Sequence, residues 1–353
     1  MTIRILQGDC CDVLKTLPDQ SVHCVVTSPP YYGLRDYGVA GQIGLEPSPA
    51  LYVDRLVEVF REVWRVLRDD GTLWLNLGDS YAGSGRGGNP ADSPHQKQAT
   101  NRGSRAFFHD NMVDNGVIGR KWVKPPAGYK QKDLIGIPWM AAFALRADGW
   151  YLRSDIIWHK PNPMPESVTD RPTSAHEHVF LLSKTRNYYY DADAIREAES
   201  VPDWDDGSRV FGGVNKHGAN VQHGRTTGRR AVARKRGLPP RHAQYESSDQ
   251  SGLDQVGRGS GRNARNVWTV ATQPFPEAHF ATFPPRLIEP CIKAGAPLGG
   301  VVLDPFGGAG TTALVADRLQ RSAILIELNP DYVDMARRRI VHDAPLLVKE
   351  AAE

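Results

Sequence analysis

The chain has 353 residues, of which 40% are hydrophobic and 24% are charged, and its formal net charge is +3 at pH 7. These values are ordinary for a globular protein with a large core, and they exclude a disordered chain. Four cysteines lack paired spacing, and we find neither an opening leader nor an apolar stretch of membrane-spanning length. We therefore expect a soluble, cytoplasmic protein with reduced thiols and no metal site.

The first part of the chain alternates short strands with helices. Residues 3–7 and 22–26 predict strands, and residues 12–17 predict one short helix between them. Residues 51–68 carry apolar side chains at helical spacing, and residues 72–77 form an apolar run that predicts a buried strand. Strand, helix and strand in this order indicate a parallel sheet with right-handed crossovers.

The middle of the chain is interrupted by an irregular insert at residues 82–132, which is too long for a plain connection. A helical pattern returns at residues 134–145. Residues 150–158 and 177–182 then predict two strands, which we expect to form an antiparallel pair at the far side of the sheet.

A second insert is strongly basic. Residues 207–245 contain no Asp or Glu. The cations there are Arg209, Lys216, Arg225, Arg229, Arg230, Arg234, Lys235, Arg236 and Arg241. Such a run can be a solvated loop. A long acid-free stretch nevertheless favours contact with nucleic-acid phosphates, because each phosphate that a Lys or Arg neutralises releases a counterion, and this release drives binding. This pattern does not distinguish DNA from RNA.

The last part of the chain predicts a nucleotide-type pocket. A strand at residues 301–303 is followed by the glycine-rich segment 304–312 and a helix to residue 319. A second strand at residues 323–326 ends at Glu327, and a final helix runs over residues 330–340. Glycines let a backbone approach its ligand closely, and a helix N-terminus offers free N–H groups.

The acids in this segment suggest which ligand it binds. Glu327 lies 23 residues after Asp304, about the spacing at which an acid binds the ribose of a nucleotide. An aspartate before the glycines, in place of the first glycine of a pyrophosphate motif, suits a ligand that carries positive charge. S-adenosylmethionine, with its sulfonium and ammonium groups, is such a ligand.

A Ser-Pro-Pro-Tyr segment, Ser28 to Tyr31, ends the strand at residues 22–26. Prolines lack an N–H and keep the preceding residue extended, so the segment is a stiff loop with a hydroxyl, free carbonyls and an aromatic ring. Alone it could be an ordinary turn. It follows a parallel strand, however, so we expect it at the same sheet edge as segment 304–312. Asp9 also follows a strand, either as a turn residue or near the cofactor adenine.

The chain resembles the amino-directed DNA methyltransferases, in the permuted (beta-type) subgroup whose catalytic half precedes the cofactor half. The segments that carry this resemblance are 28–31 (catalytic), 304–310 with Glu327 (cofactor), 279–284 (methionine end of the pocket) and 158–165 (near the target base). The resemblance implies an α/β fold with a doubly wound, mostly parallel seven-stranded sheet, of the Rossmann-like class I methyltransferase type and circularly permuted.

It also implies roles for individual residues. The catalytic residues would be Ser28, Pro29, Pro30 and Tyr31. The cofactor-binding residues would be Asp9, Thr282, Phe283, Pro284, Asp304, Phe306, Gly308, Gly310, Thr311, Thr312, Glu327 and Asn329. The residues expected to contact DNA are Arg35, Lys160, Asn162, Arg225, Arg229, Arg230, Arg234, Lys235 and Arg236.

The expected reaction moves a methyl group from S-adenosylmethionine to an exocyclic amine of a flipped base in double-stranded DNA. The Ser28 hydroxyl and the Pro29 carbonyl would accept hydrogen bonds from the amine, Tyr31 would stack on the base, and transfer would be direct and in line. Within the family a serine at the first motif position usually goes with cytosine N4, and an acid or asparagine with adenine N6. We therefore predict cytosine N4, with adenine N6 as the alternative.

Other possibilities are weaker. Attack at cytosine carbon 5 would need a Pro-Cys nucleophile, but Cys291 lies in an amphipathic stretch, where we expect a core residue. His176, Glu177 and His178 could suggest a metal site, but no third ligand is evident, so we predict a structural or surface role. A non-catalytic DNA-binding protein on the same fold, and methylation of RNA or of a protein amide, are further alternatives.

We expect three regions in the chain: a catalytic half at 1–194, a basic target-recognition insert at 195–265 and a cofactor-binding half at 266–345. The resemblance further implies a bacterial, archaeal or phage-encoded protein of a restriction-modification system, monomeric or homodimeric, that can have a cognate restriction endonuclease as its partner.

Overall fold

The computed structural model describes residues 1–34, 37–83, 125–197, 261–273 and 282–343, together with the backbone of four short strands outside these ranges. The chain divides into two compact units, one of Met1–Ile195 with Arg265–Glu353 and one of Arg196–Ala264. The predicted catalytic and cofactor halves therefore belong to the same unit, and their separate roles stay a prediction.

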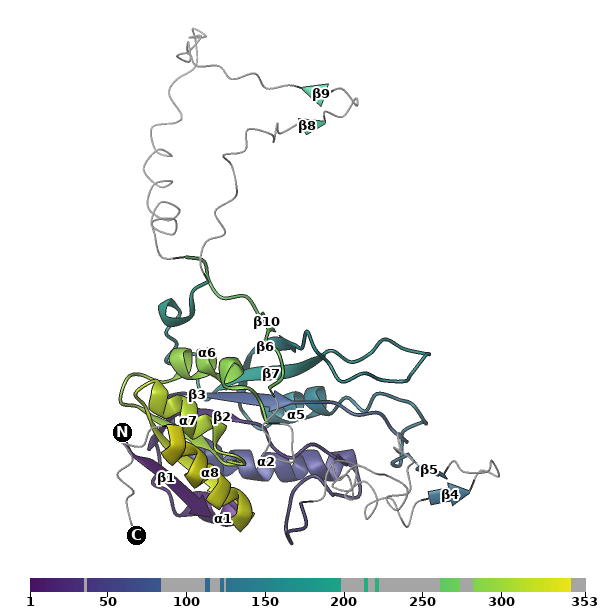
Figure 1. Cartoon of the computed structure of the whole chain (residues 1–353), viewed down its shortest axis with the longest axis horizontal. Coiled ribbons are helices and arrows are strands. Elements are labelled where there is room, and N and C mark those ends of the chain that lie inside the picture. Colours follow the sequence, from purple (N-terminus) through teal and green to yellow (C-terminus); the bar gives the residue numbers. More distant parts are fainter. Residues whose placement is uncertain are drawn as a thin grey trace. The chain divides into compact units, whose positions relative to one another are not determined.

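The first unit is built on an eight-stranded sheet with the order β1-β12-β11-β2-β3-β7-β6-β10 (Figure 1). Five strands run parallel: β1 (Ile3–Gln7), β12 (Ser322–Glu327), β11 (Val301–Asp304), β2 (Val22–Thr27) and β3 (Leu67–Leu77). The predicted antiparallel pair is confirmed as β6 (Tyr151–His159) and β7 (His176–Ser183), and β7 is also antiparallel to β3. The short strand β10 (Val267–Thr269) lies parallel to β6 and adds one strand to the predicted seven.

Helices cover both faces of this sheet (Figure 1). One layer contains α1 (Cys10–Lys15), α2 (Pro49–Val66) and α5 (Ile137–Ala147), and the other contains α6 (Pro285–Gly295), α7 (Thr311–Arg318) and α8 (Pro330–Asp343). Alternate residues of a strand enter opposite layers of core: Leu73 and Leu75 pack with the first layer, whereas Trp74 packs with the second. The predicted doubly wound α/β architecture is confirmed.

The remaining elements are short. They are η4 (Asp193–Ile195), the antiparallel pair β4 (Met112–Asp114) and β5 (Lys121–Val123), and the antiparallel pair β8 (Gly213–Val214) and β9 (Asn220–Val221). Helix α6 was predicted only as an amphipathic stretch, because Pro290 in its interior weakens the helical signal. None of the helices in the described ranges is long and apolar enough to span a bilayer.

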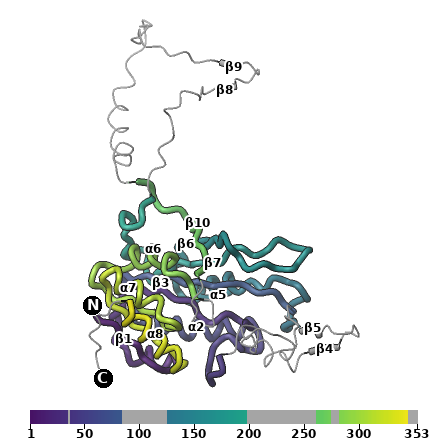
Figure 2. Tube along the Cα trace, in the orientation of Figure 1, coloured from purple at the N-terminus to yellow at the C-terminus, as the bar shows by residue number. Residues whose placement is uncertain are grey.

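Strands from the two ends of the sequence pair in the middle of the sheet. Figure 2 shows purple N-terminal and yellow C-terminal segments of the first unit beside each other. Val302 and Leu303 of β11 are in register with Cys24 and Val25 of β2. The segments that follow β2 and β11 therefore leave the sheet at the same edge, as expected for a doubly wound sheet.

Candidate active site

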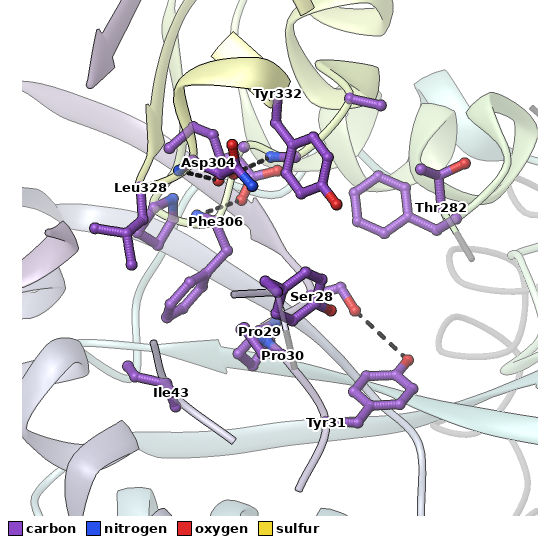
Figure 3. Close-up of a pocket in the computed structure, with 18 of the residues that line it drawn as sticks. Ser28, Pro29, Pro30, Tyr31, Ile43, Thr282, Asp304, Phe306, Leu328 and Tyr332 are labelled. Atoms are coloured by element: carbon purple, nitrogen blue, oxygen red, sulfur yellow. Dashed lines mark hydrogen bonds between the residues drawn. The ribbon is translucent and has the colours of Figure 1, made fainter. Parts of the chain in front are cut away.

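The carboxyl ends of the parallel strands border a cavity of about 270 Å³ (Figure 3). The site residues predicted from the sequence that line it are Asp9, Ser28, Pro29, Pro30, Tyr31, Lys160, Thr282, Phe283, Asp304, Phe306, Gly308, Thr311, Glu327 and Asn329. The structure thus brings the Ser-Pro-Pro-Tyr loop and the glycine-rich loop to a single cavity.

Asp304 is held at the base of this cavity by three protein donors. Its carboxylate accepts hydrogen bonds from the hydroxyls of Thr27 (2.6 Å) and Thr312 (2.7 Å) and from the Phe306 N–H (3.0 Å). Its side chain is buried, and the loss of hydration outweighs these bonds and raises the pKa of Asp304 to about 6. Because three of its roughly four lone-pair positions are occupied, Asp304 would act on a cationic ligand mainly through its charge.

Glu327, at the end of β12, borders the same cavity. Its two carboxylate oxygens accept the N–H groups of Gly308 and Asn329, each at 2.8 Å. Burial raises the pKa of Glu327 above its ordinary value. A carboxylate has about four lone-pair positions, so Glu327 is oriented by two backbone donors and keeps acceptor capacity toward the cavity.

Three of the predicted cofactor residues do not line the cavity. Pro284 is the residue before α6, and Thr312 is buried behind Asp304, which it supports. Gly310 begins α7 with φ of +80°, and a Cβ there would lie 2.9 Å from the Cβ of Ala336. Gly310 thus permits the close packing of α7 against α8.

Asp9 has a visible structural role. It is the N-cap of α1, where its carboxylate accepts the N–H groups of Cys11 (2.9 Å) and Asp12 (3.3 Å), and it lies 3.7 Å from the guanidinium of Arg55. It also lines the cavity. Both interpretations of Asp9 are therefore compatible with its position, and the contact with adenine stays a prediction.

The Ser-Pro-Pro-Tyr loop presents two acceptors to the cavity. The Pro30 carbonyl is occupied by the Tyr52 hydroxyl at 2.8 Å, whereas among the described residues we find no donor to the Pro29 carbonyl. The Ser28 hydroxyl donates to the Tyr31 hydroxyl at 3.5 Å (Figure 3), which leaves lone pairs of the Ser28 oxygen available to a ligand.

Tyr31 is tightly enclosed. Its hydroxyl lies 2.7 Å from a carboxylate oxygen of Glu177 and 3.2 Å from the amide oxygen of Asn76. Its ring packs against Gly78, where a Cβ would stand 2.5 Å from the ring. Burial, and then the charge of Glu177, raise the pKa of Tyr31 well above its ordinary value, so the phenol stays protonated. Its predicted stacking on a target base stays a prediction.

Glu177 and Asn76 line the cavity. Asn76 was not singled out in the sequence, and Glu177 was predicted to have a structural or surface role instead of a place in the site. Alternation along β7 directs Glu177 to the cavity, while His178 lies on the other face, where it contacts Asp155 at 2.9 Å and stacks on Phe180. His178 therefore has a structural role, as predicted. The sequence signal that could have revealed Glu177 is its position as a carboxylate next to the buried apolar residues 179–182 of β7.

The predicted DNA contacts fall into two groups. Lys160 lines the cavity, is paired with Glu177 and holds its ammonium 4.4 Å from the centre of the Trp158 ring, and its contact with DNA stays a prediction. Asn162 exchanges hydrogen bonds with the backbone of Thr272, at 3.0 and 3.3 Å. The other residues predicted to contact DNA lie outside the described ranges: Arg35, Arg225, Arg229, Arg230, Arg234, Lys235 and Arg236.

Large apolar side chains on the cofactor side of the cavity were also missed. They include Ile43, Leu328 and Tyr332, which line the cavity together with Phe306 (Figure 3). The ring of Tyr37, from the loop that follows the catalytic segment, lies edge-on to Tyr332 with ring centres 6.3 Å apart. This contact brings the loop over the cofactor side. A single sequence gives no signal that distinguishes such residues from core.

The carbon-5 alternative finds no support here. Cys291 is buried in α6, and its thiol donates to the Leu287 carbonyl at 3.7 Å within the same helix. Burial raises the pKa of Cys291 well above its ordinary value, which keeps the thiol from ionising to a nucleophile. Cys291 is a core residue, as predicted.

One cluster within the described ranges combines ligand types that metals use. Atoms of Asp9, Cys10 and Cys11 lie within 4.8 Å of one another. Oδ1 of Asp9 caps α1, and Oδ2 lies 3.7 Å from the guanidinium of Arg55.

Comparisons with known proteins identify the family of this chain. The family model described as DNA methylase matches residues 22–338. The type II methyltransferase M.Cfr9I of Citrobacter freundii is 42% identical over 348 residues, which cover 99% of this chain and 91% of the relative. The structure of the cytosine-N4-specific PvuII DNA methyltransferase matches with a TM-score of 0.56 at 18% identity. This match covers 100% of this chain and 89% of the PvuII chain. The structure of TTHA0409 from Thermus thermophilus, complexed with S-adenosyl-L-methionine, matches with a TM-score of 0.51 at 23% identity. This match covers 98% of this chain and 97% of the TTHA0409 chain. The chain belongs to the DNA methylase family.

Proposed function

We propose that this protein transfers the methyl group of S-adenosylmethionine to the exocyclic N4 of a cytosine in double-stranded DNA. The observation that carries the proposal is the meeting of two loops at one cavity. Ser28 and Pro29 offer hydrogen-bond acceptors there, and the acids Asp304 and Glu327 border the same space. Family membership and the S-adenosylmethionine bound to TTHA0409 support this choice of cofactor.

The two acceptors match the two hydrogens of an amino group. The Ser28 oxygen and the Pro29 carbonyl would each accept one hydrogen, which draws the nitrogen lone pair out of conjugation with the ring. The lone pair would then attack the sulfonium methyl in line, without a covalent enzyme intermediate. Positioning and fixed dipoles would supply most of the rate enhancement.

The base must leave the DNA helix to reach this cavity, because its amino group lies within the stack of an intact duplex. Tyr31 and Trp158 provide aromatic surface beside the two acceptors. We propose that the basic insert 195–265 recognises the target sequence and that residues 82–132 assist it. The protein would work as a monomer or homodimer beside a cognate restriction endonuclease.

The choice of cytosine rests on Ser28, the first residue of the catalytic loop. Adenine N6 is the alternative within the same chemistry, and a DNA-binding protein without transfer activity is the alternative from another class. The ordered cavity, with acceptors at one end and acids at the other, favours an enzyme over a protein that only binds DNA.

The decisive experiment identifies the modified nucleoside. Purified protein is incubated with methyl-labelled S-adenosylmethionine and DNA of mixed sequence, and the DNA is then hydrolysed and analysed by mass spectrometry. We expect N4-methylcytosine, and its loss in Ser28→Ala. N6-methyladenine would overturn the assignment of the base, and the absence of label in DNA would overturn the enzymatic proposal.

A further inference from the structure

A chain of hydrogen bonds runs from Ser28 away from the cofactor side of the cavity. The Ser28 hydroxyl faces the Tyr31 hydroxyl at 3.5 Å, and the Tyr31 hydroxyl faces Glu177 at 2.7 Å. Glu177 is paired in turn with Lys160. If Ser28 accepted a proton from the methylated amine, it could not keep it, because a neutral hydroxyl is a very weak base. The residues beyond Ser28 in this chain of hydrogen bonds are therefore candidates to receive that proton.

The direction of these bonds follows from proton counting. Tyr31 stays protonated and has one hydrogen, and the charged Glu177 oxygen at 2.7 Å is a better acceptor than the Asn76 amide oxygen at 3.2 Å. The phenol oxygen is then free to accept the hydrogen of Ser28. Every hydrogen in the chain thus points from the cavity toward Glu177.

The carboxylate of Glu177 is oriented by two neighbouring side chains. The Asn76 amide donates one hydrogen to Glu177 at 3.2 Å and the other to the His178 carbonyl at 3.1 Å, and Lys160 binds the second carboxylate oxygen. The Glu177 side chain is 15% exposed and lines the cavity. It is therefore oriented toward Tyr31 and keeps an exit to solvent.

We propose that Glu177 is the final acceptor of the proton that the amino group loses on methylation, reached through Ser28 and Tyr31. This inference rests on the proposed function. The bond between nitrogen and the methyl carbon forms as the bond between sulfur and that carbon breaks, which leaves a neutral thioether and a positively charged nitrogen. That nitrogen gives a proton to the Ser28 oxygen and Tyr31 gives its own to Glu177. Ser28 gives its own to Tyr31 once substrate binding has shortened their 3.5 Å contact to transfer distance. The amine and both hydroxyls end neutral, and Glu177 holds the proton until solvent removes it.

Glu177 is thus a positioning residue that acts through Tyr31 and Ser28, and a double-mutant cycle tests it. The variants are Glu177→Gln, Tyr31→Phe and the two combined. The measurements are the single-turnover rate of methyl transfer and the Kd for S-adenosylmethionine. We expect each single variant to lower the rate by at least about 10-fold, since relayed acid–base steps contribute about 10²–10⁴-fold, with cofactor Kd within about 2-fold of wild type. Members of one relay act as a unit, so the combined variant should lose little more than either single variant.

A rescue experiment separates the carboxylate from its local packing. Asn76 approaches the same Tyr31 hydroxyl as Glu177, so Asn76→Asp in the Glu177→Gln background moves the carboxylate to a neighbouring position at the same phenol. We expect the rate to recover by several-fold. Glu62→Gln, at a salt-bridged glutamate of α2, is the matched control and should keep the wild-type rate.

The outcomes separate this inference from the proposed function. No methylation by the wild-type protein would remove the proposed function itself. A wild-type protein that methylates DNA, with Glu177→Gln within about 2-fold of its rate or with additive losses in the combined variant, would overturn the relay alone. If Glu177→Gln does not fold, Tyr31→Phe tests the relay alone. A methyl-transfer rate at least about 10-fold lower supports the relay, and an unchanged rate overturns it.

Discussion

The hydroxyl of Thr27 donates a hydrogen bond of 2.6 Å to the carboxylate of Asp304, across 277 residues of sequence. Thr27 is the last residue of β2, directly before the catalytic loop, and Asp304 is the last residue of β11, directly before the glycine-rich loop. Both side chains are buried. This bond therefore fixes the cofactor loop relative to the catalytic loop at the point where the two strands end.

Thr27→Val tests this link, because valine keeps the shape of threonine and removes only the donor. We expect the free energy of unfolding to fall by about 1–3 kcal/mol, the cost of a lost hydrogen bond to a buried charged group, and cofactor binding to weaken. Urea denaturation and calorimetric titration with S-adenosylmethionine measure the two effects. The control is Thr16→Val, at an exposed threonine whose hydroxyl donates to the Val13 carbonyl. Equal stability of the two variants would contradict the link.

The raised pKa of Asp304 predicts a pH dependence of stability in the protein without cofactor. The carboxyl has a pKa of about 6 in the folded protein, above its ordinary value of 3.8, so the folded state binds the proton more tightly than the unfolded chain does. Its contribution to stability is full below pH 3.8 and is lost as the pH rises through about 6. The loss amounts to at most about 3 kcal/mol.

Asp304→Asn removes this titration. The difference in unfolding free energy between wild type and Asp304→Asn should shift in favour of the variant as the pH is raised from about 4 to about 7, and the variant should lose cofactor binding. Denaturation at a series of pH values measures the first effect. Parallel curves for the two proteins would show that Asp304 is not the group responsible.

Much of the fold could be predicted from the sequence, because apolar runs and turn residues mark the strands of a parallel sheet. The carboxyl ends of such strands share an edge, so the presence of Ser28 and Asp304 at one cavity followed from the fact that each comes at the end of a parallel strand. The short strand β10, which carries only Val267–Thr269, has too few residues for a pattern to emerge.

The far side of the cavity could not be predicted in the same way. The position of Glu177 depends on the register of β7 against β3, in which Asn76 is opposite Val179. Lys160 shows the same limit: its segment was predicted to lie near the target base, but the pairing of Lys160 with Glu177 was not predicted. Such pairings depend on the packing of strands that are distant in sequence, which one sequence does not encode locally.

Gly78 predicts a steric test of the catalytic loop. A Cβ at this position would lie 2.5 Å from the ring of Tyr31, so Gly78→Ala must displace the ring. We expect a loss of about 1–3 kcal/mol in stability from overpacking and a methyl-transfer rate at least about 10-fold lower, since Tyr31 contacts Ser28. Gly299→Ala is the control, because its φ of +74° strains an alanine while its Cβ would meet no atom within 4 Å. That variant should lose stability and keep its rate, and a similar loss of rate in both variants would exclude a specific effect on Tyr31.

The basic insert predicts a measurable salt dependence of DNA binding. Replacement of Arg234, Lys235 and Arg236 by alanine should weaken binding to all DNA sequences. It should also reduce the slope of log K against log salt by up to about 2.7, because each phosphate contact contributes about 0.9. Fluorescence anisotropy with duplex DNA between about 50 and about 200 mM salt, the range in which such slopes are measured, gives both values.

A control variant removes three exposed cations elsewhere, at Lys15, Arg61 and Arg68, and so changes the net charge equally. If the insert contacts phosphates, only the first variant lowers the slope. Equal slopes in the two variants would instead assign the effect to overall charge and remove the insert from the DNA interface.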